Sequence, residues 1–347
     1  MGKGENTLIF THGDTDGLCA GAIVLAANSN AQVSFTNPYH LLEDLRAVRN
    51  SEKVVICDIS LIESRLAQTL KRFSEIETEG ALTYIDHHPL PTTISNEDIP
   101  GRVLHDIASS ASELAYSLFQ SQLDLDHTRT AIYGAIADYL DHTPLIQKLL
   151  KRWDERTLYF ETGILFQGIE SLKKSDHELK KRIVANLAKN LPPSLDDELL
   201  RLAVQYTRRE WSVMSELKEL IRIEGNITYV LNFPFSLGKT ATYVRGLTNA
   251  LIGLAGEKRK DFIDLSLRSC DEGIDLNRLL RTIAPTLGGG GGGHPQAAGA
   301  RIPEKNFSQF LQELNNSLSL TSPSQQRCDI GSCAHENTVK RKATMTS

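Results

Sequence analysis

Residues 7–17 read TLIFTHGDTDG, a short apolar run of β type that leads directly into His, Asp and Gly residues. The same arrangement returns at VVICD (54–58) and at LTYIDHH (82–88). The stretches between these runs have helical periodicity. Strands that alternate with helices in this way predict βαβ units, and therefore a parallel sheet covered by helices.

The second half of the chain has a different rhythm. Residues 145–223 are mostly helical in period and are interrupted at LPPS (191–194), where Ser194 is expected to cap a helix. Strand patterns return at 227–233 and 262–268, with a helical stretch around 238–255 between them. A Gly-rich loop and a short strand at 300–302 follow.

We therefore expect an α/β protein of two domains. The expected parts are a parallel-sheet domain, a helical linker, a smaller α/β domain and a tail that is disordered because it lacks apolar periodicity, over residues 1–190, 191–224, 225–320 and 321–347.

Composition narrows the class of protein. The chain has 347 residues, 40% of them hydrophobic and 23% charged, which excludes a disordered or fibrous protein. A net charge of −5 gives no global positive field for nonspecific duplex binding. The sequence has neither an apolar run long enough to cross a bilayer nor a signal peptide, and its five cysteines form no zinc-type pairs. These features favour the cytoplasm, with no membrane role.

The polar residues after the three strands are candidate metal ligands. The carboxyl ends of parallel strands meet at one edge of a sheet, where ligands bind, so these residues should converge. Carboxylates brought together repel one another, and divalent cations relieve that repulsion. Taken singly, each residue has an equally ordinary role as a turn or a helix cap. The candidates are His12, Asp14, Asp16, Asp58, Asp86, His87 and His88.

A fourth piece is the small-residue run YGAIAD (133–138), which ends in Asp138. Mixed imidazole and carboxylate ligands without thiolates suit Mn²⁺, and two such ions are the usual clamp for attack on phosphorus. Cys328, Cys333 and His335 in the tail give only three ligands, which disfavours a metal site there. The role of these cysteines stays open.

The order and spacing of THGDTDG, VVICDIS, TYIDHHPLP and GAIADY resemble the four motifs of the DHH phosphoesterase superfamily. This superfamily includes the exonuclease RecJ, oligoribonucleases, cyclic dinucleotide phosphodiesterases and family II pyrophosphatases. LSLRS (265–269) and GGGGGGHPQAAG (288–299) resemble elements of the DHH-associated C-terminal domain. The one-residue gap between His12 and Asp14 is that of the RecJ-like and archaeal branches.

The resemblance implies roles for these residues. One metal ion would be held by His12, Asp14 and Asp58, and the other by Asp16, Asp58, His87 and Asp138. Asp86 would orient a neighbouring imidazole, and His88 would contact phosphate or donate a proton, so these two are the catalytic candidates. Residues expected to bind substrate are Arg268, Gly290, Gly291, Gly292, Gly293, His294, Ser109 and Ser112.

Physical reasoning supports part of this set. Glycines without Cβ atoms can turn their N–H groups toward a phosphate, and Arg268 can supply a bidentate fork. Ser109 and Ser112 begin an expected helix, where simple capping is an equal alternative.

The expected function is hydrolysis of single-stranded or very short nucleic acid, in the manner of RecJ or an oligoribonuclease, by water activated between two metal ions. Mn²⁺ is the favoured ion, with Mg²⁺ and Co²⁺ as alternatives. The alternative functions are a cyclic dinucleotide phosphodiesterase, a 3′-phosphonucleotide phosphatase and a non-catalytic replication scaffold; all six ligands are present, which disfavours the scaffold. DNA replication or repair partners and a homodimer are conceivable. RNA or DNA preference, digestion polarity and oligomeric state stay open.

Overall fold

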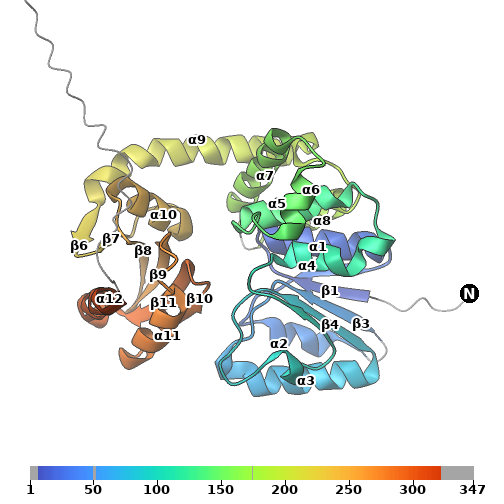
Figure 1. Cartoon of the computed structure of the whole chain (residues 1–347), viewed down its shortest axis with the longest axis horizontal. Coiled ribbons are helices and arrows are strands. Elements are labelled where there is room, and N and C mark those ends of the chain that lie inside the picture. Colours follow the sequence, from blue (N-terminus) through green and yellow to red (C-terminus); the bar gives the residue numbers. More distant parts are fainter. Residues whose placement is uncertain (1–6, 50–51, 174, 322–347) are drawn as a thin grey trace, which may run out of the picture.

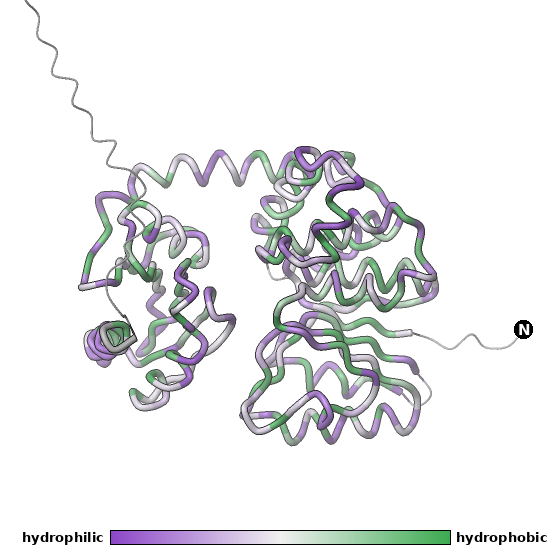
Figure 2. The backbone as a smooth tube through the Cα atoms, viewed as in Figure 1, coloured by the Kyte–Doolittle hydropathy of each residue, from purple (hydrophilic) through white to green (hydrophobic). Residues whose placement is uncertain are grey.

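The computed structural model describes residues 7–49, 52–173 and 175–321. Two α/β units lie side by side, and the long helix α9 (Asp197–Leu220) runs from one to the other (Figure 1). Much of this linking helix is polar, whereas apolar residues fill the strands of both units (Figure 2). The expected α/β class, with a parallel sheet first and a second sheet after a helical connection, is confirmed.

The N-terminal sheet is entirely parallel, with strand order β2-β1-β3-β4-β5. The chain leaves β1 for one neighbour and returns to place β3 on the other side, so β1 and β3 flank the point where the strand order reverses. The five strands are β1 (Thr7–Thr11), β2 (Gln32–Phe35), β3 (Lys53–Cys57), β4 (Ala81–Asp86) and β5 (Arg102–His105).

Helices cover both faces of this sheet. Alternate residues of β3 point to opposite faces, so Val55 and Cys57 pack in one core, whereas Val54 and Ile56 pack in the other. The second of these cores lies under the short helix α2 (Leu41–Asp44) and α3 (Leu66–Glu79). On the other face lie α1 (Thr15–Ala27), α4 (Ala111–Phe119), α5 (His127–Ala137), α6 (Pro144–Leu150), α7 (Glu155–Glu170) and α8 (His177–Leu187).

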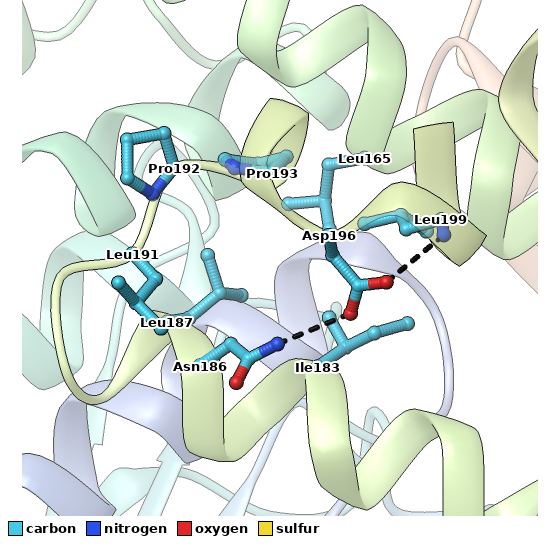
Figure 3. A pocket seen from close by; sticks show the side chains of 9 residues that line it. All are labelled: Leu165, Ile183, Asn186, Leu187, Leu191, Pro192, Pro193, Asp196 and Leu199. Atoms are coloured by element: carbon cyan, nitrogen blue, oxygen red, sulfur yellow. Dashed lines mark hydrogen bonds between the residues drawn. The ribbon is translucent and has the colours of Figure 1, made fainter. Parts of the chain in front are cut away.

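The linker helix begins two residues later than expected. Asp196, not Ser194, caps α9: its side chain accepts a hydrogen bond from the backbone of Leu199, and Asn186 donates to the same carboxylate (Figure 3). The Ser194 hydroxyl donates instead to Glu161. The small apolar pocket beside this cap has a volume of about 10 Å³, too little for a ligand.

The C-terminal sheet is mixed, with strand order β10-β11-β9-β8-β7-β6. Only β7 and β8 are parallel neighbours in it. Its elements are β6 (Arg222–Glu224), β7 (Ile227–Leu231), α10 (Leu237–Thr248), β8 (Ile252–Arg259), β9 (Phe262–Ser269), α11 (Leu276–Thr286), β10 (Gly290–Gly293), β11 (Ala297–Pro303) and α12 (Phe307–Thr321).

Two expectations for this region are wrong. The helix expected over 238–255 ends at Asn249, which adopts the left-handed conformation, and the apolar residues after it form the buried strand β8. The Gly-rich segment is not a loop, because Gly290–Gly293 pair with β11 as an edge strand. The tail expected to be disordered, from residue 322, and its cysteines lie outside the described residues.

Two sets of contacts fix the C-terminal unit against the first. On one side, Lys239 of α10 donates to Gln167 of α7 at 2.6 Å and pairs with Glu210 of α9 at 2.9 Å. Tyr243 also donates to Glu210. On the other side, Arg281 of α11 reaches the carbonyls of Pro89 and Leu90 at 3.5 and 3.4 Å, just after β4. The second sheet is therefore held over the carboxyl edge of the first.

No helix within the described part of the chain is long and apolar enough to span a membrane.

Candidate metal centre and substrate cleft

The residues expected at the strand ends lie together at the carboxyl edge of the N-terminal sheet. Asp14 caps α1, accepting a hydrogen bond from the backbone of Gly17, and Asp16 lies in the first turn of that helix. Asp58 follows β3 with a left-handed φ of 59°, and its backbone N–H continues the ladder to Ile85. Asp138 ends α5 and approaches from the helical layer.

Two groups of side chains meet at Asp58. In the first, the Nδ1 atom of His12 lies 2.7 Å from Asp14 Oδ2 and 3.7 Å from Asp58 Oδ2. In the second, the Nε2 atom of His87 lies 3.2 Å from Asp58 Oδ1, 3.3 Å from Asp138 Oδ2 and 3.8 Å from Asp16 Oδ2. Asp58 presents one oxygen to each group, so its carboxylate lies between the two.

The chemistry of this cluster fits divalent cations. Both carboxylate oxygens of Asp58 and both ring nitrogens of His87 are buried and have no hydrogen-bond partner among the described residues. Burial raises the pKa of Asp58 well above its usual range, and the neighbouring carboxylates of Asp14 and Asp16 raise it further. Because unpaired buried acceptors and clustered carboxylates destabilise a fold, a bound cation would satisfy both groups.

Asp16 is held by the start of helix α4, which is far from it in the sequence. Its carboxylate accepts hydrogen bonds from the backbone N–H groups of Ala111 at 2.7 Å and Ser112 at 3.0 Å, at the start of α4. A helix N-terminus favours an anion, so α4 fixes the orientation of this carboxylate. The pKa of Asp16 is nevertheless raised by its burial.

The serines expected near substrate have other contacts. Ser110 is the N-cap of α4, so the capping alternative holds for this segment. Ser112 is fully buried and donates to the carbonyl of Ala131, and the hydroxyl of Ser109 donates to Asp106. The structure thus places Ser112 in the core beside Asp16, and its contact with substrate stays a prediction.

Asp86 and His88 form a separate pair beside the cluster. Asp86 Oδ1 lies 2.8 Å from His88 Nδ1, and the Tyr84 hydroxyl donates to the other oxygen of Asp86 at 2.9 Å. Burial by itself would lower the pKa of His88, but the Asp86 carboxylate outweighs it, and the pKa is raised. A carboxylate in this position orients the ring and favours its protonated form.

Small residues allow the helical layer to approach the cluster. A Cβ atom at Gly134 would lie 2.2 Å from Ser112 Oγ and 2.4 Å from Asp16 Oδ1. The run of small residues before Asp138 is therefore a packing requirement, because α5 must lie against α1 and α4 for Asp138 to reach His87.

The C-terminal unit contributes His294 and Arg268. The ring of His294 lies 4.7 Å from the rings of both His87 and His88, and burial, followed by the charge of His88, lowers its pKa to about 3. Arg268 donates to Ser266 Oγ and to the carbonyl of Leu267. Burial lowers the pKa of Arg268, while Tyr139 and Asp138 act in the opposite direction.

The glycines allow a strand to pair closely, and their expected contact with phosphate stays a prediction. A Cβ atom at Gly289 would lie 2.2 Å from the carbonyl oxygen of Arg301, and one at Gly291 would lie 2.9 Å from Gly299 O. Gly293, with a φ of 143°, donates its N–H to Asn277. Close strand pairing therefore explains several of these glycines, and it is β10 that brings His294 to the first sheet.

Sequence reasoning missed two basic residues near the site. Lys180 of α8 donates to the carbonyl of Gly13 at 2.7 Å, inside the first ligand loop, and Arg281 reaches the loop after His88. A signal existed for Lys180, because it occupies the apolar face of α8 at helical spacing from Ile183 and Val184. Arg281 carries no comparable signal.

Comparisons with known proteins identify the family of the chain. The sequence matches the N-terminal domain of the DHH family over residues 6–141 and the DHHA1 domain over residues 235–320. A search of curated proteins found no match.

Several solved structures share the fold at low identity. A DHH-domain protein described as a member of a family of ribosomal proteins is 15% identical, with a TM-score of 0.70 over 91% of this chain and 87% of its own. RecJ from Thermus thermophilus, in complex with Mn²⁺, is 19% identical, with a TM-score of 0.66 over 94% of this chain. The match covers 53% of that RecJ chain.

A pGpG-specific phosphodiesterase, PggH from Vibrio, is 12% identical, with a TM-score of 0.56 over 92% of this chain and 100% of its own. Both family domains match in the expected order, on segments that carry the ligand cluster and the strand of Arg268. The chain therefore belongs to the DHH superfamily of phosphoesterases and has a C-terminal DHHA1 domain.

Proposed function

We propose that the chain is a metal-dependent phosphodiesterase that hydrolyses single-stranded or very short nucleic acid from an end. The observation that carries this proposal is Asp58: its two buried oxygens have no hydrogen-bond partner in the described ranges and face two separate groups of candidate ligands beneath His294. In this proposal one ion is held by His12, Asp14 and Asp58, and the other by Asp16, Asp58, His87 and Asp138. Such ions supply a hydroxide from bound water and neutralise phosphate charge.

The chain's own residues would prepare the remaining chemistry. Asp86 holds His88 in one orientation and raises its pKa, so His88 is suited to give a proton to the departing oxygen. His294, whose lowered pKa keeps it neutral, can accept or donate one hydrogen bond without adding charge. Arg268 would supply a cation for a phosphate next to the one being cleaved.

The contacts that hold the two units together favour a flexible, single-stranded substrate. Arg281 and the Lys239 cluster hold β10 and α10 close to the first sheet. A duplex is a stiff rod that would have to fit between these contacts, whereas a short strand can enter by its end. RecJ and the pGpG-specific phosphodiesterase among the similar folds agree with this substrate class.

The test is an assay of the metal-free protein supplied with Mn²⁺, Mg²⁺ or Co²⁺. Substrates are labelled RNA and DNA from two to about twenty nucleotides, a cyclic dinucleotide, a 3′-phosphonucleotide and inorganic polyphosphate. We expect metal-dependent release of mononucleotides from the short strands. Turnover of only the cyclic dinucleotide or the 3′-phosphonucleotide would replace this proposal by one of its alternatives. Lack of turnover with every substrate and metal would refute it.

A further inference from the structure

Tyr139 occupies a backbone position that usually belongs to glycine. It follows Asp138 at the end of α5, where the N–H of Tyr139 bonds to the carbonyl of Ile136 and the N–H of Leu140 bonds to that of Ala135. This is the Schellman pattern of helix termination, and the residue at the position of Tyr139 must take a left-handed φ, here 59°. A side chain with a Cβ atom is strained in this conformation.

No other aromatic residue in the described ranges has a positive φ. The remaining non-glycine residues with this backbone are Asp58, Asn190, Asn232, Asn249 and Lys260. Three of them are asparagines, which tolerate the left-handed region through local hydrogen bonds of their side chains. Local backbone chemistry therefore gives no reason for a tyrosine here.

Packing gives no reason either. Tyr139 is 78% exposed, although it directly follows a buried metal-ligand candidate. Within the described part of the chain its hydroxyl has no hydrogen-bond partner. The ring thus contributes little to the core. Its presence at a strained position indicates that it contacts a bound molecule.

The surroundings of Tyr139 indicate where such a molecule would bind. Tyr139 is among the groups that act to raise the pKa of Arg268 and of Tyr243, and both of these residues belong to the C-terminal unit. On its other side the ring is adjacent in sequence to Asp138, which is 3.3 Å from His87. Tyr139 therefore directly follows a residue of the ligand cluster and lies near enough to the C-terminal unit to interact with Arg268.

We propose that Tyr139 is a stacking platform for a nucleobase next to the scissile phosphate. A tyrosine ring offers a rigid apolar face with few rotatable bonds, and stacking accepts every base because each has a π face. This inference rests on the proposed function and narrows it to substrates that carry a base. Inorganic polyphosphate or pyrophosphate would leave the ring without a partner.

Binding is tested with a fluorescent base. The probe is a 5′-phosphorylated dinucleotide that contains 2-aminopurine and a methylene phosphonate linkage, which resists hydrolysis. With Mn²⁺ present, the native protein and Tyr139→Phe should quench its fluorescence through stacking. Tyr139→Ala should lose the quenching and bind about 5- to 150-fold more weakly, the range found for one base on one aromatic ring.

A second variant separates the ring from its strained backbone. Tyr139→Gly removes the ring and places the preferred residue at the end of α5, so its melting temperature should equal or exceed that of the native protein. Its binding should be as weak as that of Tyr139→Ala. Trp211→Ala is the control, because Trp211 is a similarly exposed aromatic residue on α9, and the probe should bind it as it binds the native protein.

Hydrolysis of an oligonucleotide with an abasic residue at its end completes the test. Loss of the ring should raise KM for the normal strand and leave KM for the abasic strand unchanged. Equal effects on both strands, or normal quenching by Tyr139→Ala, would overturn the role of Tyr139 while the phosphodiesterase proposal stands. If the native protein hydrolyses neither strand, the proposed function fails, and the quenching experiment still decides whether Tyr139 stacks on a base.

Discussion

The two sheets meet at the cleft with opposite kinds of surface. The carboxyl edge of the N-terminal sheet presents buried carboxylates and imidazoles, several of them without hydrogen-bond partners among the described residues. The facing part of the C-terminal sheet, β10 and β11, is built mainly of glycine and alanine. The C-terminal unit adds two candidate substrate-binding side chains, His294 and Arg268.

This difference suggests that the first region carries the catalytic chemistry and the second binds the substrate. The first edge crowds several carboxylates together, and burial together with this crowding raises the pKa of Asp58; a bound cation would relieve the repulsion. The second edge carries few charges and needs none to fold, because its glycines satisfy the close pairing of β10 with β11. We therefore expect substitutions in the first region to abolish catalysis and substitutions in the second to weaken substrate binding.

The largest effect is expected from Asp58→Asn. Asparagine tolerates the left-handed φ of this position, so the fold should survive, whereas the charge facing both ligand groups is lost. We expect kcat to fall by at least about 10³, equivalent to roughly 4 kcal/mol of transition-state stabilisation. Steady-state kinetics and calorimetric titration with Mn²⁺ measure the two losses. Asp141→Asn, a nearby carboxylate outside both groups, is the control.

The pH dependence of the stability of the same variant tests the crowding of carboxylates at this edge. The folded protein without metal raises the pKa of Asp58, so it binds the proton more tightly than the unfolded chain does. The contribution of Asp58 to stability is therefore present below about pH 4 and is lost as the pH rises. With metal chelated, Asp58→Asn should be less sensitive to this rise in urea unfolding. An identical pH dependence in both proteins would contradict the crowding of carboxylates.

A smaller effect is expected from Arg268→Ala, in the region expected to bind substrate. One charge-assisted phosphate contact contributes about 1.5–3 kcal/mol, so kcat/KM should fall roughly 10- to 150-fold. Most of the change should appear in KM, with the Mn²⁺ stoichiometry unchanged. Arg268→Lys should restore only part of the activity, because an ammonium lacks the planar fork.

Arg301→Ala is the matched control for this prediction, since Arg301 lies on β11 and is exposed, paired with Asp264. If Arg268→Ala loses Mn²⁺ binding, or keeps a normal kcat/KM on every strand tested, catalysis and substrate binding are not divided between the two regions.

The smallest expected effect concerns two neighbouring glycines. An alanine at Gly289 would place Cβ 2.2 Å from a backbone carbonyl, so Gly289→Ala should lower the free energy of unfolding by about 1–3 kcal/mol. Gly290→Ala meets nothing within 4 Å and should be nearly neutral. Thermal and urea unfolding compare the two. Equal stability of both variants would mean that β10 does not pair as closely as described.

Much of the N-terminal fold and the ligand cluster was predictable from local patterns. Apolar runs that end in His and Asp residues place strands and their carboxyl ends, and a parallel sheet then brings His12, Asp58 and His87 to one edge. Strand β5 and helix α12 carried weaker patterns and were not predicted. The sequence pattern does not single out the tyrosine after Asp138, because exposure and backbone strain cannot be read from a residue type.

Sequence alone determined which residues can serve as ligands or allow unusual backbone conformations. These properties change little with context, because a carboxylate remains an oxygen ligand and a glycine keeps its backbone freedom. Only the tertiary structure decided how they are used. The Gly-rich segment became a strand because β11 lies close enough to pair with it, and Ser112 became a support for Asp16 because α4 begins behind that carboxylate. Such outcomes depend on contacts between segments far apart in the chain, and no local pattern encodes which of the competing hydrogen-bond partners will be nearest after folding.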